Sequence, residues 1–386
     1  MKKVKFGVIG MGNMGGLHAK YLIGGAVENA ELSAVADIDP EKLESFKKTA
    51  GGEYSFFHDG KELIGNADVD AVIVATPHYS HCELSIAALE KGIHTVCEKP
   101  AGVYAKQVKE MNAVAAKSKS LFTVMFNHRM NPIYIKMRDM VRGGDLGSLK
   151  RVTWHITNWY RPQSYYDSSN WRATWAGEGG GVLVNQCPHQ LDLLQWIVGM
   201  PAKVHAKCHF GKWHNIETED DVSAYLEFPD GATGVFITST GDYPGTDRFE
   251  IVGSKGQLVA ENGALTFYRL AVDEREYNKT FKGLFGAPEY TTENFSFDSR
   301  GPQHVGILNN FANAIQGIEP LYIDGREGLK GVELMNGILL SCWLNKEVAL
   351  PADENLFLSE LQERAKKTKK KTVRKVDAAD MNASFR

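Results

Sequence analysis

Apolar residues in the first 127 positions form short continuous runs, and amphipathic stretches separate these runs. Continuous runs are typical of parallel strands that are buried on both faces. The alternation therefore predicts a doubly wound parallel sheet covered by helices. The expected strands are residues 3–10, 31–37, 56–57, 71–76, 94–97 and 121–126, and the expected helices are residues 14–22, 41–50, 80–91 and 105–117.

The pattern changes in the second half, where strand-like stretches follow one another. Many of them alternate polar and apolar residues, as in VSAYLEF at 222–228, which predicts an antiparallel sheet with one covered face. The expected strands are 149–158, 204–210, 222–228, 233–240, 248–253 and 265–270, with helices at 182–198, 304–316 and 328–345.

These patterns together predict the fold class and the domains. We expect an α/β Rossmann domain at residues 1–127 and an α+β domain with a large, mainly antiparallel open-faced sheet at 128–350. The second domain would bind substrate and form the oligomer. Residues 351–386 form a C-terminal extension with a basic tail.

Composition narrows the class of protein. The 386 residues are 43% hydrophobic and 24% charged, as in ordinary globular proteins. No apolar run approaches the 18 residues that span a bilayer, and the N-terminus lacks the apolar core of a signal peptide, so we expect a cytoplasmic protein. The five cysteines are odd in number and lack CxxC spacing, which favours reduced thiols over disulfides or zinc.

Charge is unevenly distributed along the chain. The net charge is −3, but residues 364–386 carry nine Lys or Arg against Asp377 and Asp380. An acidic body with a basic tail does not resemble a nucleic-acid-binding domain. The tail is interpreted either as a solvated, mobile end or as an arm that docks on a neighbouring subunit.

A glycine motif follows the first expected strand. Gly10, Gly12 and Gly15 have GxGxxG spacing around Asn13 and Met14, and a helix follows them. The glycines permit a tight turn, close approach of a pyrophosphate and close helix–strand packing. Asp37 ends the second strand, where a carboxylate accepts hydrogen bonds from a ribose 2′-hydroxyl and repels a 2′-phosphate. The motif therefore predicts a dinucleotide site that prefers NAD to NADP.

Two further motifs carry a resemblance to a known family. ATPHYSHCELSIAALEKGIHTVCEKPAG at 75–102 and GEGGGVLVNQCPHQLDLLQW at 177–196 resemble the glucose–fructose oxidoreductase, inositol dehydrogenase and rhizopine-catabolism (Gfo/Idh/MocA) family. The resemblance spans roughly residues 4–350. It implies bound nicotinamide cofactor and oxidation or reduction of a sugar or cyclitol hydroxyl. It also implies that Lys99 and His189 sit at the nicotinamide.

The proposed chemistry needs a group that takes a proton from a hydroxyl. His189 is the first candidate for this base, because the pKa of histidine lies near neutrality. Lys99 would then stabilise the developing alkoxide, although a lysine with a lowered pKa is itself a candidate base. Many family members have Asp where this chain has Asn185, which would orient a substrate hydroxyl.

Other site residues are expected from strand ends and from the resemblance. Thr76 and Pro77 end the fourth strand, where the ligand crevice of an open sheet lies. By resemblance they border the nicotinamide ribose, as does His81, and Glu98 either binds ribose hydroxyls or caps its own loop. Asn127 and His128 would border the substrate or form a hinge between domains, and Trp171 and Arg172 would lie near the cofactor.

Aromatic residues gather at 154–175, and they suit either sugar stacking or packing. Of these, Tyr165 is expected at the substrate. The histidines have loose spacings, such as His78/His81 and His205/His209/His214, so no metal site is expected.

Three functions compete. The first is an NAD-dependent dehydrogenase acting on a sugar, glycoside or cyclitol, favoured at C3 of a pyranose. The second is a glycosidase or lyase that oxidises C3 only transiently, and the third is a non-catalytic NAD-binding regulator. We also expect a homodimer or homotetramer, because one face of the second sheet, carrying Val235, Ile237, Phe249 and Ile251, lacks helices to cover it.

Overall fold

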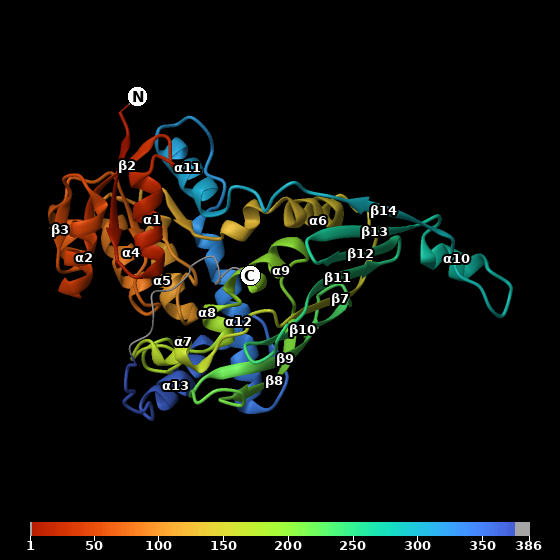
Figure 1. The fold of residues 1–386 in the computed structure, drawn as a ribbon. Coiled ribbons are helices and arrows are strands. Elements are labelled where there is room, and N and C mark those ends of the chain that lie inside the picture. Colours follow the sequence, from red (N-terminus) through yellow and green to blue (C-terminus); the bar gives the residue numbers. More distant parts are fainter. Residues whose placement is uncertain (1, 375–386) are drawn as a thin grey trace.

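The computed structural model describes residues 2–374, which form two sheets with helices around and between them (Figure 1). The first sheet has six parallel strands in the order β3-β2-β1-β4-β5-β6. This order confirms the predicted doubly wound sheet. Its strands are β1 (Val4–Ile9), β2 (Ala30–Ala36), β3 (Ser55–Phe57), β4 (Ala71–Val74), β5 (His94–Cys97) and β6 (Phe122–Val124).

Helices connect these strands, and local sequence explains where they begin. Asp39 accepts a hydrogen bond from the backbone N–H of Glu41, and Pro40 occupies the first position of the helix that follows. Asp59 caps a short helix that the sequence analysis missed. The helices are α1 (Asn13–Ile23), α2 (Pro40–Ala50), α3 (Gly60–Asn66), α4 (Ser80–Glu90) and α5 (Ala105–Ala115).

The second sheet has nine strands in the order β14-β13-β12-β11-β7-β10-β9-β8-β15. Its pairs are antiparallel except for β7 and β10, which run parallel at its centre. The sheet is therefore mainly antiparallel, as predicted. The strands are β7 (Leu149–Ile156), β8 (Lys203–Phe210), β9 (Glu219–Glu227), β10 (Thr233–Ser239), β11 (Asp247–Gly253), β12 (Gly256–Glu261), β13 (Ala264–Leu270), β14 (Tyr290–Phe295) and β15 (Val348–Ala349).

Helices cover one face of this sheet. Trp154 on β7 stacks on Phe249 of β11 with ring centroids 4.1 Å apart, and Tyr134 of the helix before β7 packs against the tryptophan. The helical elements of this half are η1 (Asn127–Met130), α6 (Pro132–Arg142), α7 (Gln163–Asp167), α8 (Val182–Asn185), α9 (Pro188–Ile197), α10 (Glu274–Thr280), α11 (Gln303–Ile315), η2 (Gly325–Glu327), α12 (Gly328–Leu344) and α13 (Glu354–Ala365).

The expected content of the open sheet face is partly wrong. Phe249 and Ile251 are buried in the core under the helices, because their positions on β11 point to the covered side. Val235 and Ile237 are only partly buried on β10, and they lie on the other face. The open face is thus less apolar than the sequence analysis supposed.

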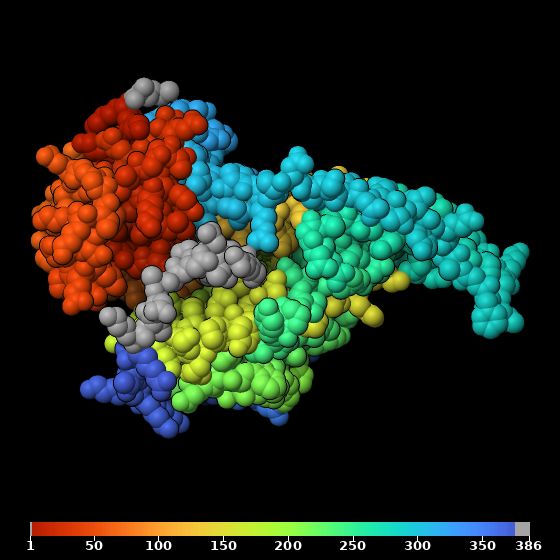
Figure 2. Space-filling model, in the orientation of Figure 1, coloured from red at the N-terminus to blue at the C-terminus, as the bar shows by residue number. Residues whose placement is uncertain are grey.

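Two C-terminal helices join the two halves of the chain. Phe311 of α11 packs on Phe6 of the first sheet, with ring centroids 6.4 Å apart. Helix α12 contacts α5 of the first half and both α9 and β8 of the second. One continuous apolar core therefore runs through both sheets. At the far edge of the second sheet, the segment around α10 projects from the body (Figure 2), and Leu284 is almost fully exposed there.

The described part of the basic tail lies on its own chain. Lys371 donates hydrogen bonds to the backbone carbonyls of Tyr166 and Arg172, and the backbone of Arg374 donates to the carbonyl of Asp167. Up to residue 374 the tail is therefore not the free solvated end that one interpretation expected. The remaining residues of the predicted tail, 375–386, lie outside the described part of the chain.

The five cysteines are free, and four of them are buried. Among residues 2–374, no helix is long and apolar enough to cross a lipid bilayer.

Candidate active site

The glycine turn after β1 has the shape that a dinucleotide requires. Gly10 has φ +91°, and a Cβ on Gly15 would lie 1.7 Å from the Gly10 carbonyl oxygen, so neither position accepts a side chain. A Cβ on Gly12, by contrast, would meet nothing within 4 Å. This open space lies at the N-terminus of α1, beside Asn13 and Met14, where the helix favours an anion.

Asp37 follows β2 and faces this turn. One of its carboxylate oxygens accepts a hydrogen bond from the backbone N–H of Met11 at 2.7 Å, and the other accepts from Asp39 at 2.9 Å. Lys42 lies 3.5 Å from the same carboxylate. Each carboxylate oxygen can accept a second hydrogen bond, so the geometry leaves capacity for a ribose hydroxyl.

The ends of β4 and β5 are joined by His81. The two ring nitrogens of His81 lie 2.8 Å from the carbonyl oxygens of Thr76 and Pro100. Both nitrogens are thus engaged by backbone, and the histidine holds the Thr76–Pro77 turn against the Lys99–Pro100 turn. The Thr76 hydroxyl is buried and has no partner among the described residues, which fits a group that would contact a bound ligand.

Glu98 is bound on both sides of its carboxylate. It contacts the ring of His18 at 2.7 Å and accepts from the backbone N–H of Lys99 at 3.1 Å. Burial alone would raise the pKa of Glu98, but the bond to His18 and the nearby positive charges lower this pKa to about 2. The ring of His18 also packs edge-on against His304 at 5.8 Å. In this structure Glu98 anchors the loop that carries Lys99.

Lys99 and Asn185 meet in the centre of the site. The Lys99 ammonium donates a hydrogen bond of 2.8 Å to the backbone carbonyl of Asn185. Burial lowers the pKa of Lys99, while Glu98 and Glu178 oppose this effect. The lysine is therefore a partly buried amine whose protonation depends on its acidic neighbours.

His189 lies against His128. Their rings stack with centroids 4.3 Å apart and an interplanar angle of 14°. Burial, together with the neighbouring His128 and Lys99, lowers the pKa of His189 well below its usual value of 6.5. The Nδ1 atoms of both rings are buried without a hydrogen-bond partner in the described structure. His189 is thus neutral at neutral pH and free to accept a proton, but its lowered pKa makes it a weaker base than the ordinary histidine that the sequence analysis assumed.

The helix expected at 182–198 would place Asn185 and His189 one turn apart on one face, but the structure interrupts this helix. Helix α8 ends at Asn185, and α9 begins at Pro188. Proline lacks an N–H and disfavours helical geometry in the residue before it, so the chain turns at Gln186 and Cys187. The two side chains therefore lie on separate helices, not one turn apart on a single helix.

Asn127 and His128 begin the short η1 helix between the sheets. Asn127 is 2% exposed and donates a hydrogen bond of 2.8 Å to Gln303, at the start of α11. Gln303 has a left-handed backbone with φ +48°, an uncommon conformation for a residue other than glycine. The N-terminus of α11 thus reaches the site, although the sequence analysis placed nothing from it there.

The aromatic segment divides between site and core. Arg172 donates a hydrogen bond of 2.7 Å to the Tyr165 hydroxyl, which lies 3.4 Å from the side-chain oxygen of Asn185. Trp171 packs edge-on against His78 at 5.8 Å. By contrast, Trp154 and Trp175 are buried in packing contacts.

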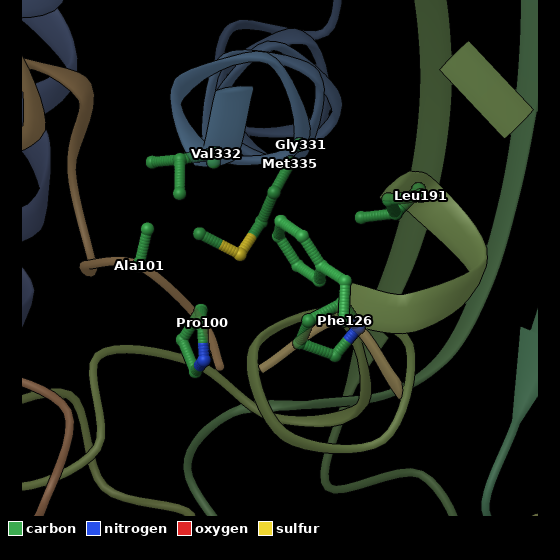
Figure 3. Close-up of a pocket in the computed structure, with 9 residues that line it drawn as sticks. Pro100, Ala101, Phe126, Leu191, Gly331, Val332 and Met335 are labelled. Carbon is green, nitrogen blue, oxygen red and sulfur yellow. The ribbon is translucent and has the colours of Figure 1, made fainter. Parts of the chain in front are cut away.

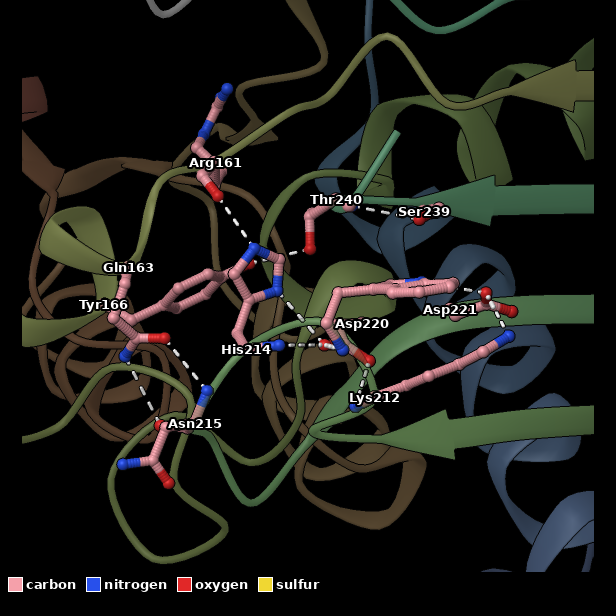
Figure 4. Close-up of polar contacts among 12 residues, drawn as sticks. Arg161, Gln163, Tyr166, Lys212, His214, Asn215, Asp220, Asp221, Ser239 and Thr240 are labelled. Carbon is pink, nitrogen blue, oxygen red and sulfur yellow. Dashed lines mark hydrogen bonds and ion pairs between the residues drawn. The ribbon is translucent and has the colours of Figure 1, made fainter. Parts of the chain in front are cut away.

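A polar cluster holds this aromatic segment to the second sheet (Figure 4). His214 contacts the Asp220 carboxylate at 3.1 Å and the Arg161 carbonyl at 2.8 Å, so both ring nitrogens are engaged. The Tyr166 hydroxyl donates to Thr240 at 2.8 Å. Among the described residues, no group of three or more His, Cys, Asp or Glu side chains is arranged to hold a metal ion.

An apolar pocket lies directly beneath the site (Figure 3). Pro100, Phe126 and Pro188 line it, and each is the chain neighbour of a candidate site residue: Lys99, Asn127 and His189. Gly331 and Met335 of α12 close the opposite side. The three loops that carry the polar groups therefore rest on one apolar base.

Sequence reasoning missed Glu178, Gln303 and His304. Glu178 directly precedes the Gly179–Gly181 turn, and this adjacency to the second motif was the available signal. Gln303 and His304 lie about 175 residues from Asn127 and His128. No local pattern marks a contact of that separation.

Comparison with known proteins agrees with this geometry. Residues 4–126 match the family described as "Oxidoreductase family, NAD-binding Rossmann fold", and residues 134–259 match the "GFO/IDH/MocA C-terminal domain". The chain is 26% identical to a myo-inositol 2-dehydrogenase of Thermotoga maritima over 333 residues, which cover 84% of this chain and 92% of the relative. It is 25% identical to a levoglucosan dehydrogenase of Pseudarthrobacter phenanthrenivorans, with 67% and 74% covered.

Among solved structures, the WlbA dehydrogenase of Chromobacterium violaceum in complex with NADH and UDP-GlcNAcA superposes with a TM-score of 0.79. The two sequences are 28% identical, and the match covers 92% of this chain and 97% of the other. The glycine turn and the first sheet lie in the segment matched at residues 4–126, and much of the second sheet lies in the segment matched at 134–259. The chain therefore belongs to the GFO/IDH/MocA family of NAD-dependent oxidoreductases, which act on CH–OH groups, and its cofactor is NAD.

Proposed function

We propose that this protein is a dehydrogenase that oxidises, or in the reverse direction reduces, a secondary hydroxyl of a sugar, glycoside or cyclitol, with C3 of a pyranose as the favoured position. One observation carries the proposal. Lys99, Asn185 and His189 lie close together, next to the parallel sheet whose first turn holds the glycine motif. A partly buried lysine, a neutral histidine and an amide together can bind a hydroxyl and remove its proton.

The residues divide the work as follows. His189 is neutral and takes the hydroxyl proton as general base, while the Lys99 ammonium donates a hydrogen bond to the same oxygen and stabilises its developing negative charge. When bound at the strand ends, NAD would supply the acceptor for the hydride that leaves the carbinol carbon. Asn185 and Tyr165 hold neighbouring hydroxyls, and Asn127 and His128 border the same space.

We assign the cofactor to the turns at the ends of the parallel strands, where open α/β sheets bind ligands. Gly10, Gly12, Gly15 and the start of α1 hold the pyrophosphate, and Asp37 holds the adenosine ribose. Thr76, Pro77, Glu98 and Lys99 border the nicotinamide ribose, with His81 fixing the backbone of these turns. Trp171 and Arg172 close this end of the site.

The names of the relatives support the substrate class. They include inositol and levoglucosan dehydrogenases, and the superposed dehydrogenase was solved with UDP-GlcNAcA. Each of these names denotes a cyclic polyol or sugar. The preference for C3 rests on Asn185-Gln186 and on the aromatic segment around Tyr165, which suits the C–H face of a pyranose.

A second candidate is a glycosidase or lyase that oxidises C3 transiently. The keto group would acidify the neighbouring C–H, the glycosidic bond would be eliminated and the hydride would return, so no NAD would be consumed overall. The same three side chains serve both reactions. A non-catalytic NAD-binding regulator is disfavoured because it has no need of Lys99 and His189.

One experiment separates these candidates. The purified protein is incubated with NAD and a panel of pyranosides and cyclitols, and NADH absorbance and aglycone release are recorded separately. A dehydrogenase gives NADH without aglycone, and a glycosidase gives aglycone without net NADH. A protein that binds NADH and gives neither signal with any substrate would overturn both catalytic functions.

A further inference from the structure

Glu178 is a buried acidic residue beside the proposed site. It is 2% exposed and directly precedes the Gly179–Gly181 turn. One carboxylate oxygen accepts a hydrogen bond from the backbone N–H of Ala173 at 2.5 Å, and the other accepts from the side-chain amide of Asn185. Ala173 itself has a left-handed backbone with φ +51°, so the carboxylate is held by an uncommon local conformation.

Asn185 connects this carboxylate to Lys99. The lysine ammonium bonds to the Asn185 backbone carbonyl at 2.8 Å, while Glu178 binds the side-chain amide of the same residue. Burial raises the pKa of Glu178, while the charge of Arg172 and the hydrogen bonds from Ala173 and Asn185 oppose this effect. In its ionised form the carboxylate only accepts hydrogen bonds, so the NH₂ group of Asn185 faces Glu178. The side-chain oxygen of Asn185 therefore points toward the Tyr165 hydroxyl, 3.4 Å away, and remains an acceptor for a substrate hydroxyl.

The charges around Lys99 come from several elements. Glu98 and Glu178 favour its ammonium form, whereas Arg161 and Arg172 disfavour it. The histidines near it, His78, His128, His189 and His304, have pKa values lowered by burial and are neutral at neutral pH. Glu98 is already bound to His18 and to its own loop. Among the described residues, Glu98 and Glu178 are the two carboxylates that most raise the pKa of Lys99.

We propose that Glu178 is a positioning residue of the dehydrogenase site: it holds the side-chain amide of Asn185, turns the side-chain oxygen of that residue toward the substrate, and places a carboxylate near the Lys99 ammonium that the Asn185 carbonyl binds. The inference rests on the proposed function, because it concerns the group that donates to the reacting oxygen. Glu178 itself touches neither substrate nor cofactor in this arrangement.

The first test measures Lys99 without any turnover. Competitive labelling of lysines with acetic anhydride across a range of pH, followed by mass spectrometry, gives the apparent pKa of Lys99. In Glu178→Gln this pKa falls by about one pH unit, because an attractive negative charge is removed. Glu333→Gln is the matched control: Glu333 on α12 also faces a lysine, Lys109, at 3.7 Å, and its loss leaves the titration of Lys99 unchanged.

The second test uses rescue and kinetics. Glu178→Gln lowers kcat about 10- to 100-fold and moves the alkaline limb of its pH profile to lower pH, with the Kd for NADH unchanged within about twofold. In Glu178→Gln/Asn185→Asp a carboxylate returns beside Lys99, and the lysine titration moves back toward that of the wild type. If Glu178 had a purely structural role, the titration of Lys99 in Glu178→Gln would already match that of the wild type, and the added carboxylate would move it above the wild-type pKa.

The Lys99 titration can fail independently of the substrate panel that tests the proposed function. An unchanged Lys99 titration in folded Glu178→Gln overturns this proposal, whether or not a substrate is found. If Glu178→Gln does not fold, Asn185→Leu breaks the same link with Glu178 retained, and it must raise KM more than it lowers kcat. An Asn185→Leu enzyme with wild-type KM would likewise overturn the positioning role.

Discussion

Lys99 is partly buried and His189 is buried, and burial disfavours the charged form of each side chain. The outcome differs because their neighbours differ. Lys99 has carboxylates nearby that restore its charge, whereas His189 is surrounded by another histidine and by the lysine. At the same pH, Lys99 can therefore donate a hydrogen bond while His189 can accept a proton. Removal of a proton from a hydroxyl requires both.

We expect Lys99→Ala and His189→Ala to lose about 10²–10⁴-fold in kcat, the usual contribution of proton transfer by a positioned side chain. Both variants should still bind NADH, because the glycine turn and Asp37 are unaltered. Steady-state kinetics and fluorescence titration with NADH measure the two properties. Near-normal turnover in either variant would show that the assigned role is wrong.

Asp37 determines the choice of cofactor at the residue scale. Its carboxylate is held by Met11 and Asp39 and would repel a 2′-phosphate. We expect the wild-type protein to bind NAD more tightly than NADP. Asp37→Ser should reduce the difference in affinity between NAD and NADP. In this variant Lys42, which lies 3.5 Å from the Asp37 carboxylate in the wild type, can bind the 2′-phosphate. Binding titrations with both cofactors decide the matter, and tighter binding of NADP by the wild type would contradict it.

At the scale of elements, the sequence predicted most strands of both sheets and most of the helices around them. It did not predict where a helix is interrupted. Periodicity identified a single helix at 182–198, yet Pro188 divides it and thereby sets the angle between Asn185 and His189. Periodicity also cannot show that β7 and β10 pair in parallel, because their pairing joins residues about 80 positions apart. The same limit hid Gln303 and His304, which α11 brings to the site.

Helix α11 gives a prediction about pH. Burial lowers the pKa of His304 to about 4, against 6.5 when it is unfolded. Below pH 6.5 the unfolded chain therefore binds a proton that the folded chain does not, and stability falls as the pH is lowered toward 4. The slope is about 1.4 kcal/mol per pH unit for each such proton.

His304→Asn should reduce this slope, because one of the buried histidines is removed. The free energy of unfolding in urea, measured between pH 7 and pH 5, gives the comparison. The carboxyl of Glu98, with its pKa held to about 2, does not contribute to the difference in this range. Equal slopes in His304→Asn and the wild type would contradict the burial assigned to His304.

At the scale of the whole molecule, the second sheet leaves one face without helices. Val235 and Ile237 lie partly buried on this face, and their partners on β7 are the polar residues Thr153 and His155. We predict that a second copy covers the face, giving a dimer or a tetramer of 42.8 kDa chains. Light scattering at micromolar concentration should give at least twice that mass, and a mass near 43 kDa would refute the assembly.

A substitution pair locates the interface. Ile237→Arg should dissociate the assembly, whereas Leu284→Arg, on the projecting segment around α10, should leave its mass unchanged. The opposite result would assign the interface to the projecting segment. Deletion of residues 366–386 should not change the mass either, because the described part of the tail bonds to its own chain.

The most direct test of the account follows the hydrogen that leaves the substrate. A pyranoside that is active in the panel is prepared with deuterium at C3 and incubated with NAD, and the NADH formed is analysed by mass spectrometry. We predict NADH that carries one deuterium, formed by the wild type and strongly diminished in Lys99→Ala and His189→Ala. NADH without deuterium would contradict oxidation at C3, and deuterium that stays in the product while the aglycone is released would contradict net dehydrogenation.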